Sequence, residues 1–468
     1  MSRSGSHPVT APIRTDAVDP AESETWLAHR RARVFWGSVL VAVLVGPSLI
    51  WMLRAGPQPP LHHLSVLTGL LALSGMVVVA VLPSRVRALS RALGLETLLG
   101  LHRRLGVMAG VFVALHVACA VADDPSRVGL LVPMLAPGRG QAATLATIAL
   151  GTLLVLALRG IRPGGTHEVW RWVHLSLAAL VVGGAALHVL WLNNLVNDAV
   201  LGPVLGMLGL LVLVVLVLRW GMRGLVNDDG EFRVVVVRPE SATVSTLVLE
   251  RRGRHTGPWF APGQFAWLRL ERSAVEEHPF TIASSAADSG RVEFTVRHTG
   301  DFASRLRTLR RGWAVWVDGP YGSFTPDAVP SSGLVLIAGG VGITPMMSML
   351  RTAADRGDRR PYRLVVHARD RADLLFRGEL AHLRMCLDLQ VTEVLRRPSR
   401  DWGGATGPID TGLLAAVLTD LGSTPGRPAP RLDYFICGRP QLVADVLDTL
   451  GSLGVPDDRV HTEQFAQV

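Results

Sequence analysis

Six apolar segments lie in the first half of the chain, and each approaches or exceeds the length that a helix needs to cross a membrane. They occupy residues 34–53, 64–82, 101–122, 142–158, 168–192 and 199–218. A hydrocarbon core about 30 Å thick requires roughly 20 apolar helical residues. Because lipid offers no hydrogen bonds to the backbone, only helices or closed barrels span it, and segments of this length favour helices. We therefore predict an all-α bundle of six membrane helices over residues 34–220.

The remainder of the chain has a different composition. Of the 468 residues, 49% are hydrophobic and 18% are charged, and the apolar excess lies almost entirely before Trp220. Residues 1–33 are polar and lack the apolar core of a cleaved signal peptide, which predicts a disordered cytoplasmic tail. The composition thus predicts an integral membrane protein, expected in a bacterial plasma membrane, with a soluble half after Trp220.

The charges of the loops predict the orientation of the bundle. Arginines concentrate in alternate loops, and such loops face the cytoplasm. The arginines of these loops are Arg30, Arg31, Arg33, Arg85, Arg87, Arg91, Arg103, Arg104, Arg159, Arg162, Arg171, Arg219 and Arg223. With six spans, both termini are then cytoplasmic. Since topology explains these arginines, the net charge of +9 does not indicate a nucleic-acid partner.

Two histidines lie fourteen residues apart in the third segment, and the fifth segment repeats this spacing. Fourteen helical residues rise about 21 Å and return close to the same helix face. The third and fifth spans run parallel, so the histidines match in depth as an inner pair, His102 and His174, and an outer pair, His116 and His188. Polar side chains inside a bilayer are expensive and indicate a function.

Facing imidazoles suit the two axial positions of six-coordinate haem iron, so we predict two b-type haems, one at each pair. His167 lies seven residues before His174 and is the alternative inner ligand, but the equal spacing of the other four histidines favours His174. Cations near the inner level would pair with haem propionates or simply follow the positive-inside rule. These are Arg103, Arg104 and Arg171.

After a short polar linker, the sequence changes to short runs such as FRVVVVRP and RVEFTVRH, separated by Gly and Pro. Such runs are typical of β-strands, and they predict a small antiparallel β-barrel over residues 228–328. Three segments in it combine a strand end with small, hydroxyl and cationic side chains: residues 278–285, 296–306 and 319–324. Together they suit a flavin ring with its pyrophosphate, whereas any one of them alone would indicate only an ordinary turn.

A third pattern covers residues 331–468. The run LVLIAGGVGITPMMSML predicts a buried strand, a glycine turn and the start of a helix, which is an arrangement that binds phosphate groups. Strands and helices then alternate, which predicts a doubly wound α/β domain with a parallel sheet. The last strand ends in CGRP. Cys437 therefore lies either at the ligand-binding carboxyl edge of the sheet or in the core as a structural cysteine.

The ordered occurrence of the paired histidines, HPFT, GPYG, GGVGITP and CGRP resembles the ferric reductase and NADPH oxidase family of transmembrane flavocytochromes. The resemblance covers about residues 34–465. It implies a six-helix di-haem domain fused to a ferredoxin-reductase-like module with FAD and pyridine-nucleotide sites. It also implies an NAD(P)H-dependent oxidoreductase that moves electrons from cytoplasmic NADPH through FAD and two haems to a small-molecule acceptor at the outer face.

The resemblance implies roles for individual residues. The FAD site would comprise His278, Pro279, Phe280, Thr281, Arg297, Gly300, Asp301, Phe302, Ser304, Gly319, Pro320, Tyr321 and Gly322. The pyridine-nucleotide site would comprise Gly339, Gly340, Val341, Gly342, Ile343, Thr344, Pro345 and Gly438. Cys437 and Glu463 are the candidate catalytic residues. Phe465 resembles the terminal aromatic that covers the flavin, although three further residues follow it here.

The choice of nucleotide depends on the segment VHARDRADLLF. An acidic residue at this strand end would bind the ribose 2′-hydroxyl of NADH, whereas arginine binds a 2′-phosphate bidentately. Arg369 and Arg371 therefore predict NADPH. NADH stays the alternative, since Asp370 and Asp373 would neutralise these arginines.

Two other interpretations of the whole chain remain. In one, a reductase is held by a haem-free membrane anchor; in the other, a membrane cytochrome carries a soluble part that only docks a partner. Within the leading interpretation the acceptor is a ferric iron chelate or dioxygen, which would give superoxide. The outer loops show no evident site for either acceptor, and no motif indicates a protein partner.

Overall fold

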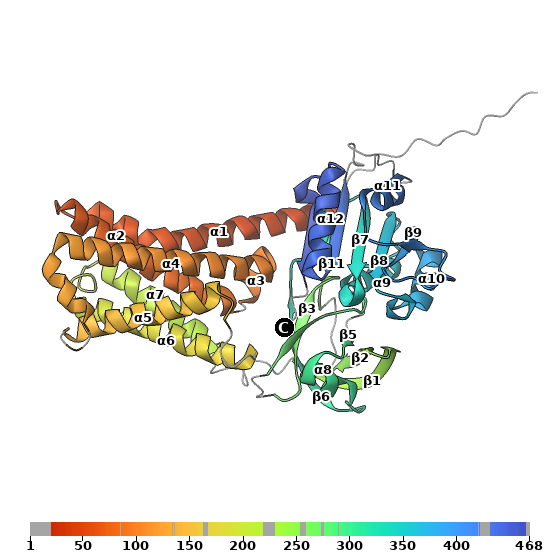
Figure 1. Ribbon diagram of the computed structural model, residues 1–468, viewed down its shortest axis with the longest axis horizontal. Coiled ribbons are helices and arrows are strands. Elements are labelled where there is room, and N and C mark those ends of the chain that lie inside the picture. Colours follow the sequence, from red (N-terminus) through yellow and green to blue (C-terminus); the bar gives the residue numbers. More distant parts are fainter. Residues whose placement is uncertain are drawn as a thin grey trace, which may run out of the picture.

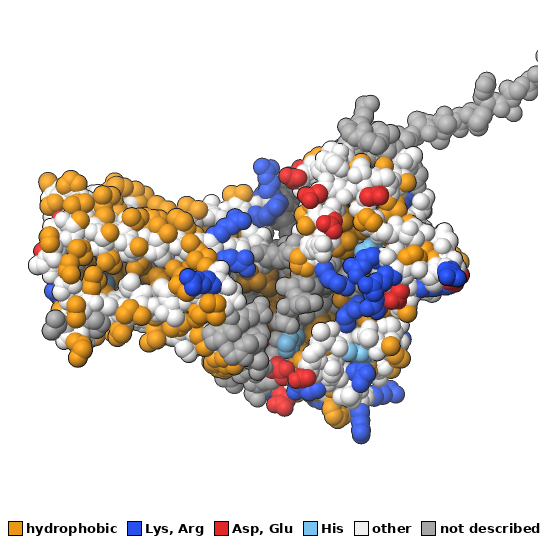
Figure 2. Space-filling model, viewed as in Figure 1, with side chains coloured by type: hydrophobic (Ala, Val, Ile, Leu, Met, Phe, Trp, Pro, Cys, Tyr) orange, Lys and Arg blue, Asp and Glu red, His pale blue; other side chains and the backbone are white. Residues whose placement is uncertain are grey.

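The computed structural model divides into a helical half and a half built on two β-sheets (Figure 1). It describes residues 20–84, 86–132, 134, 136–161, 167–218, 230–252, 259–272, 276–288, 290–419, 421 and 431–464. The surface of the helical half is largely hydrophobic, and Arg side chains gather at its end next to the sheets (Figure 2). This distribution is the one expected of a bundle surrounded by lipid, with its basic side chains outside the hydrocarbon core.

The helical half consists of α1 (Pro20–Arg54), α2 (Pro60–Val81), α3 (Arg87–Leu93), α4 (Leu95–Asp123), α5 (Gly138–Leu158), α6 (His167–Leu192) and α7 (Leu201–Leu216), with 3-10 turns η1 (Leu82–Ser84) and η2 (Pro125–Leu131). Among the described residues, five helices (α1, α2, α4, α5 and α6) are long and apolar enough to cross a membrane. The sixth expected span corresponds to α7, a shorter apolar helix of 16 residues.

The helix α1 differs from the prediction at its start. It begins at Pro20, so the predicted disordered tail through residue 33 is wrong for residues 20–33. Its 35 residues extend about 52 Å, which exceeds a hydrocarbon core of about 30 Å. The helix therefore reaches beyond the membrane, and it contacts the 3-10 turn η5 (Pro326–Ala328) of the sheet half.

Small residues allow the membrane helices to approach closely. α4 packs mainly on α2, and α6 packs mainly on α5. A Cβ on Gly184 of α6 would lie 2.9 Å from the Ala142 carbonyl oxygen of α5, and one on Gly110 of α4 would lie 2.4 Å from Leu154 Cδ1. Glycine at such contacts is typical of helix packing in lipid, where van der Waals contact replaces the hydrophobic effect.

The first sheet forms the antiparallel domain. Its strands are β1 (Glu231–Ser241), β2 (Val244–Arg251), β3 (Phe265–Arg269), β4 (His278–Thr281), β5 (Arg291–Arg297) and β6 (Ala314–Tyr321), with α8 (Gly300–Arg307) after β5. The strand order is β4-β3-β6-β1-β2-β5, and the paired strands are antiparallel. Alternate side chains such as Phe232, Leu249 and Phe294 are fully buried between the sheet faces and α8.

The second sheet forms the parallel domain. Its elements are β7 (Gly333–Gly339), η6 (Gly340–Gly342), α9 (Ile343–Arg356), β8 (Tyr362–Ala368), η7 (Arg371–Asp373), α10 (Arg377–Cys386), β9 (Leu389–Leu395), β10 (Ala405–Thr406), α11 (Thr411–Thr419), β11 (Leu432–Gly438), α12 (Pro440–Ser452), η8 (Asp457–Arg459) and β12 (Val460–Gln464). The strand order is β10-β9-β8-β7-β11-β12. The chain builds outward from β7 on one side and then on the other, so β7 and β11 flank a topological switch point, where ligands bind in such sheets.

The two halves touch beside the GPYG motif. α3 contacts β6, and Gly94, which joins α3 to α4, lies against Ser323. The loop between the second and third spans therefore meets the antiparallel domain at one of its three chemically distinctive segments.

Candidate functional site

The structure places the four membrane histidines in the inner and outer pairs that their spacing predicts. The ring centres of His102 and His174 lie 6.0 Å apart, and those of His116 and His188 lie 6.4 Å apart. All four side chains are half-buried. Along the described residues α4 and α6 do not pack closely on each other, so each pair faces across the space between these two helices.

Backbone carbonyls orient three of these rings. The Nδ1 atoms within hydrogen-bond distance of a carbonyl oxygen are those of His102 (Val79, 3.0 Å), His116 (Ser65, 2.7 Å) and His188 (Arg139, 3.0 Å). Because a carbonyl oxygen only accepts, Nδ1 carries the proton and Nε2 keeps its lone pair. Metal-ligating histidines show this arrangement, in which the second ring nitrogen donates to a carbonyl or carboxylate.

The spacing of the pairs also fits a metal atom between the rings. Two metal–imidazole bonds of about 2.0–2.1 Å each bring ring centres to about 6 Å. Nδ1 of His174 is buried and has no hydrogen-bond partner in the part of the chain that the structure describes. Gly69 makes room at the outer pair, because a Cβ there would lie 2.8 Å from His116 Nδ1. His167 begins α6, but its side chain lies outside the described residues.

In the antiparallel domain, the HPFT motif forms strand β4 and packs on α8. The Phe280 and Phe302 rings stack with centres 6.2 Å apart, and the His278 ring lies 4.5 Å from Phe302. Thr281 ends the strand, and its Oγ1 is buried without a hydrogen-bond partner among the described residues. A buried hydroxyl left unsatisfied by the protein is a position where a ligand atom fits.

The start of α8 and the end of β5 bring the predicted diphosphate residues together. Gly300 has φ +80°, Asp301 lies in the first helical turn, and the Ser304 hydroxyl donates to the Gly300 carbonyl at 2.9 Å. Arg297 ends β5 and reaches toward the other domain, because its Nη2 lies 3.2 Å from the position of a Cβ on Gly340. One cation therefore stands between the two predicted phosphate-binding segments.

The GPYG motif turns the chain at the end of β6. A Cβ on Gly319 would lie 2.7 Å from Ala266 Cβ, and Gly322 has φ +104°, so both glycines are required by the local backbone. Pro320 lies between Gly319 and Tyr321. The Tyr321 side chain is 2% exposed, and its hydroxyl donates to the buried Asp318 carboxylate at 2.9 Å. The tyrosine ring therefore packs inside the domain.

At the switch point of the parallel sheet, the glycine turn contacts the end of β11. A Cβ on Gly342 would lie 2.2 Å from the Cys437 carbonyl oxygen, and a Cβ on Gly438 would lie 3.5 Å from Gly339 Cα. The adjoining residues Val341, Ile343, Thr344 and Pro345 form the turn and the start of α9. Only glycine permits this close approach of the two strand ends.

The two candidate catalytic residues lie on neighbouring strands. Cys437 on β11 pairs in parallel register with Glu463 on β12. The Cys437 side chain is fully buried in the core of the parallel domain, and its backbone carbonyl lies against the glycine turn. Phe465 lies outside the described residues.

Carboxylates lie close to both arginines that are predicted to bind the 2′-phosphate. Arg369 Nε lies 3.2 Å from Asp370 Oδ2 and 3.4 Å from Asp373 Oδ2, and Arg371 Nη1 lies 3.6 Å from Asp401 Oδ2. All three ion pairs are exposed or half-exposed. Asp370 and Asp373 thus lie close to Arg369, as the alternative from the sequence expects, whereas Asp401 is a further carboxylate that this alternative did not include.

Two further arginines, which the sequence pattern does not indicate, lie beside this site. Arg396 and Arg397 follow β9, and their backbone N–H groups donate to the carbonyl oxygens of Ala368 (3.0 Å) and Arg369 (2.8 Å). Both side chains are exposed and form no ion pair within the described ranges. Burial lowers the pKa of His367 on β8, and Arg396 and Arg439 lower it further, although a hydrogen bond to the Gly407 carbonyl opposes the shift. Only strand pairing, which sequence pattern does not specify, brings these residues together.

The antiparallel sheet, the glycine turn at a parallel-sheet switch point and the membrane helices define a membrane-bound reductase with flavin and pyridine-nucleotide domains. Comparisons with known proteins agree. Family models match a ferric reductase like transmembrane component at residues 68–185, an FAD-binding domain at residues 240–325 and an oxidoreductase NAD-binding domain at residues 336–448.

Characterised relatives match the reductase half. Ferredoxin–NADP reductase B of Sorangium cellulosum is 32% identical over 243 residues, which cover 51% of this chain and 98% of that protein. The reductase component of propane 2-monooxygenase from Mycolicibacterium goodii is 28% identical over 249 residues, 52% of this chain and 69% of that protein. The flavohemoprotein of Bordetella pertussis is 27% identical over 250 residues, 50% of this chain and 60% of that protein.

The chain therefore has the architecture of the ferric reductase and NADPH oxidase family, in which a ferric-reductase-like transmembrane domain is joined to FAD- and NAD-binding domains. It is an integral membrane, NAD(P)H-dependent oxidoreductase.

Proposed function

We propose that this oxidoreductase moves electrons from cytoplasmic NADPH through FAD and two haem b groups to a small-molecule acceptor at the outer face. The observation that carries the proposal is the two facing histidine pairs, with ring centres 6.0 and 6.4 Å apart at two depths of one bundle. When bound, FAD converts the two-electron chemistry of hydride into single-electron steps, and haem carries single electrons.

The protein residues position these groups. The carbonyls of Val79, Ser65 and Arg139 hold the proton on Nδ1 of three histidines, so Nε2 keeps its lone pair and would hold the haem iron. The two histidine pairs lie about 21 Å apart along parallel helices. Redox centres at both pairs would leave only short distances for electrons to cross in a hydrocarbon core about 30 Å thick. A single pair would leave most of that thickness without a redox centre.

The topology completes the proposal. We place α7 as the sixth span and both termini in the cytoplasm, which agrees with the basic end of the bundle next to the sheets. A bridge between Ile282, beside edge strand β4, and Phe294 on edge strand β5 supports closure of the antiparallel sheet into a barrel.

NADPH is the proposed donor because cations dominate the carboxyl edge of β8 and β9. Arg369 and Arg371 are opposed by carboxylates, whereas Arg396 and Arg397 have no acidic partner in the described part. Arginine binds phosphate bidentately, so this edge suits a 2′-phosphate. Ferredoxin–NADP reductase B, whose name includes NADP, is among the relatives of this domain.

The haem content of purified protein tests the route. The parent should show a Soret band and two haems per chain, whereas a haem-free anchor would show none. His102→Leu or His174→Leu should remove the inner haem and stop haem reduction by nucleotide, while flavin reduction continues. His116→Leu should stop transfer to the outside while the inner haem still reduces. Two full equivalents of haem in His102→Leu would show that the pairing is wrong.

The acceptor is a ferric chelate or dioxygen. The two are separated by measuring ferric reduction and superoxide production side by side on the purified protein. A membrane cytochrome whose soluble part only docks a partner would neither contain flavin nor oxidise nucleotide.

A further inference from the structure

The helix α9 carries a polar face that the nucleotide site does not use. Its first residues complete the glycine turn, and one face further along presents Ser348, Arg351 and Thr352. Residues spaced by three and four positions lie on the same side of a helix. Ser348 and Thr352 are almost fully buried, and the Arg351 side chain is 12% exposed.

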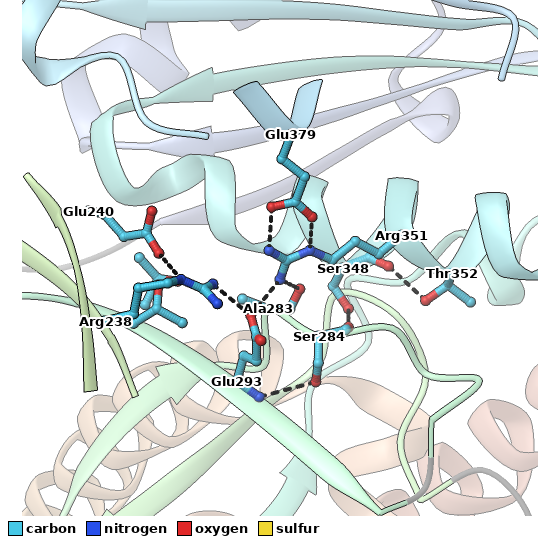
Figure 3. Close-up of polar contacts among 11 residues, drawn as sticks. Arg238, Glu240, Ala283, Ser284, Glu293, Ser348, Arg351, Thr352 and Glu379 are labelled. Carbon is cyan, nitrogen blue, oxygen red and sulfur yellow. Dashed lines mark hydrogen bonds and ion pairs between the residues drawn. The ribbon is translucent and has the colours of Figure 1, made fainter. Parts of the chain in front are cut away.

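Side chains on this face form hydrogen bonds with residues 283–286, which follow the predicted flavin-binding strand β4 (Figure 3). Ser348 Oγ donates to the Ser284 carbonyl at 2.9 Å, and Arg351 Nη1 donates to the Ala283 carbonyl at 2.7 Å. The Ala286 backbone N–H donates to Thr352 Oγ1 at 2.9 Å. Residues 283–286 lie on the FAD-binding domain, and α9 lies on the NAD-binding domain, so all three hydrogen bonds cross the domain boundary.

Ion pairs anchor the centre of these contacts. Arg351 binds Glu379 of α10 through two bonds of 2.6 and 2.7 Å, and it reaches Glu293 of β5 at 3.1 Å. A largely buried cation whose three nitrogen atoms all have acceptors is rigid, because breaking one contact leaves an uncompensated charge. Arg238 approaches the same Glu293 carboxylate at 3.4 Å and pairs with Glu240 at 3.0 Å.

The cleft beside these contacts bears on how the two domains are held in register. A cleft of about 700 Å³ opens between the two domains beside them, lined by residues such as Arg238, Asp288, Arg351 and Asp355. Apolar packing also joins the two domains, since Val244 and Phe324 belong to the buried core of the parallel domain, whereas polar contacts border the cleft and can fix the register of the domains there. Hydrogen bonds are directional and lose strength within a few tenths of an ångström, so they can set it.

We propose that Ser348, Arg351 and Thr352 form an interdomain clamp that positions the nucleotide loop relative to the HPFT motif for hydride transfer. The clamp extends the proposed function, because it acts on the first step of that electron route. The step moves one hydride, with its two electrons and one proton, from reduced nicotinamide to flavin and needs no other reactant. The clamp residues touch neither group; they act through the backbone of residues 283–286 on one side and through α9 on the other.

Two variants of the full-length FAD-loaded protein test the clamp. The Ser348→Ala/Thr352→Val double variant removes two cross-domain hydrogen bonds and leaves every charge in place. Arg351→Met removes the third, although it also takes the arginine partner from Glu379 and leaves Glu293 with Arg238. One matched control is Thr419→Val, whose hydroxyl donates to the Ala415 carbonyl within α11. The other is Arg377→Met: Arg377 lines the same cleft, and its ion pair with Glu393 stays inside the NAD-binding domain.

Hydrogen exchange of the nucleotide-free protein gives a readout independent of turnover. The double variant should lose amide protection at residues 283–286, and both controls should keep it. In stopped-flow mixing, its limiting rate of flavin reduction should fall at least about tenfold, since a misplacement of about 1 Å costs up to about a hundredfold. The half-saturating nucleotide concentration and the FAD content should stay close to those of the parent, because the clamp positions both sites without binding either ligand.

An unchanged limiting rate in the double variant, with lost protection, would overturn the proposal. Loss of FAD in proportion to lost activity would also overturn it, since the contacts would then serve folding alone. Failure of the electron route itself looks different. In that case the parent reduces its flavin but no haem, while the exchange and flavin measurements still decide the clamp.

Discussion

Gly94 of the membrane half lies directly against Ser323 of the FAD-binding domain: a Cβ placed on Gly94 would lie 2.5 Å from Ser323 Oγ and 3.4 Å from Ser323 Cβ. Gly94 also has φ +78°, a conformation that other residues adopt only with strain. This contact joins the loop before α4, which carries the inner-pair histidine His102, to the turn that follows GPYG.

Gly94→Ala should therefore slow electron transfer between the two halves. The substitution introduces both a steric conflict and backbone strain of about 1–3 kcal/mol, so the docking of the halves should loosen. We expect slower haem reduction after mixing with NADPH, at an unchanged rate of flavin reduction. Gly100→Ala is the control, because a Cβ there meets no atom within 4 Å. Equal haem reduction in both variants would mean that this contact does not guide transfer.

Gly69→Ala should disturb the outer histidine pair selectively. A Cβ at this position would lie 2.8 Å from His116 Nδ1 and displace the ring from the Ser65 carbonyl. Haem analysis of the purified variant should show loss or spectral change of one haem, with the inner haem still reduced by nucleotide. Gly75→Ala on the same helix is the matched control, since its Cβ makes an ordinary contact of 3.6 Å with Ala109. A normal outer haem in Gly69→Ala would argue against His116 as a ligand.

The parent enzyme should prefer NADPH over NADH, and Arg369→Ala should reduce that preference. Each charge-assisted hydrogen bond to the 2′-phosphate is worth about 1.5–3 kcal/mol, so the ratio of kcat/KM values should fall about tenfold or more. Because Asp370 and Asp373 oppose Arg369, we expect Arg396→Ala and Arg397→Ala to reduce it as well. Arg384→Ala, which removes an exposed charge at the far end of α10, should leave it unchanged. Equal use of both nucleotides by the parent at physiological salt would contradict this prediction.

The stability of the NAD-binding domain should depend on His367 at mildly acidic pH. Burial, with Arg396 and Arg439, holds the folded-state pKa of His367 below its ordinary value. As pH falls below the ordinary histidine pKa of about 6.5, the unfolded state binds the proton first, so the contribution of His367 to folding stability declines. Thermal unfolding should show a smaller loss between pH 7.5 and 5.5 in His367→Asn than in the parent. His382→Asn, on the exposed side of α10, should behave like the parent. The same pH loss in His367→Asn would refute this assignment.

Local pattern was sufficient for much of the architecture. Apolar length determines which segments can enter a membrane, and the change from a helical to a strand period marks the domain boundaries without any knowledge of contacts. The fourteen-residue repeat was enough to pair His102 with His174 and His116 with His188, because a helix converts sequence spacing into depth and direction by a fixed geometry.

Contacts between distant segments were decided only by the tertiary structure. Nothing local to Ser348, Arg351 and Thr352 indicates that they meet residues 283–286 of another domain, and nothing local to Arg396 places it beside Ala368. Likewise, no apolar run indicates that α1 starts at Pro20. The helix extends beyond its apolar segment and contacts η5 of the sheet half. Periodicity specifies which face of an element is buried, whereas the partner it meets depends on strand order and domain docking, which are set by packing summed over the whole chain.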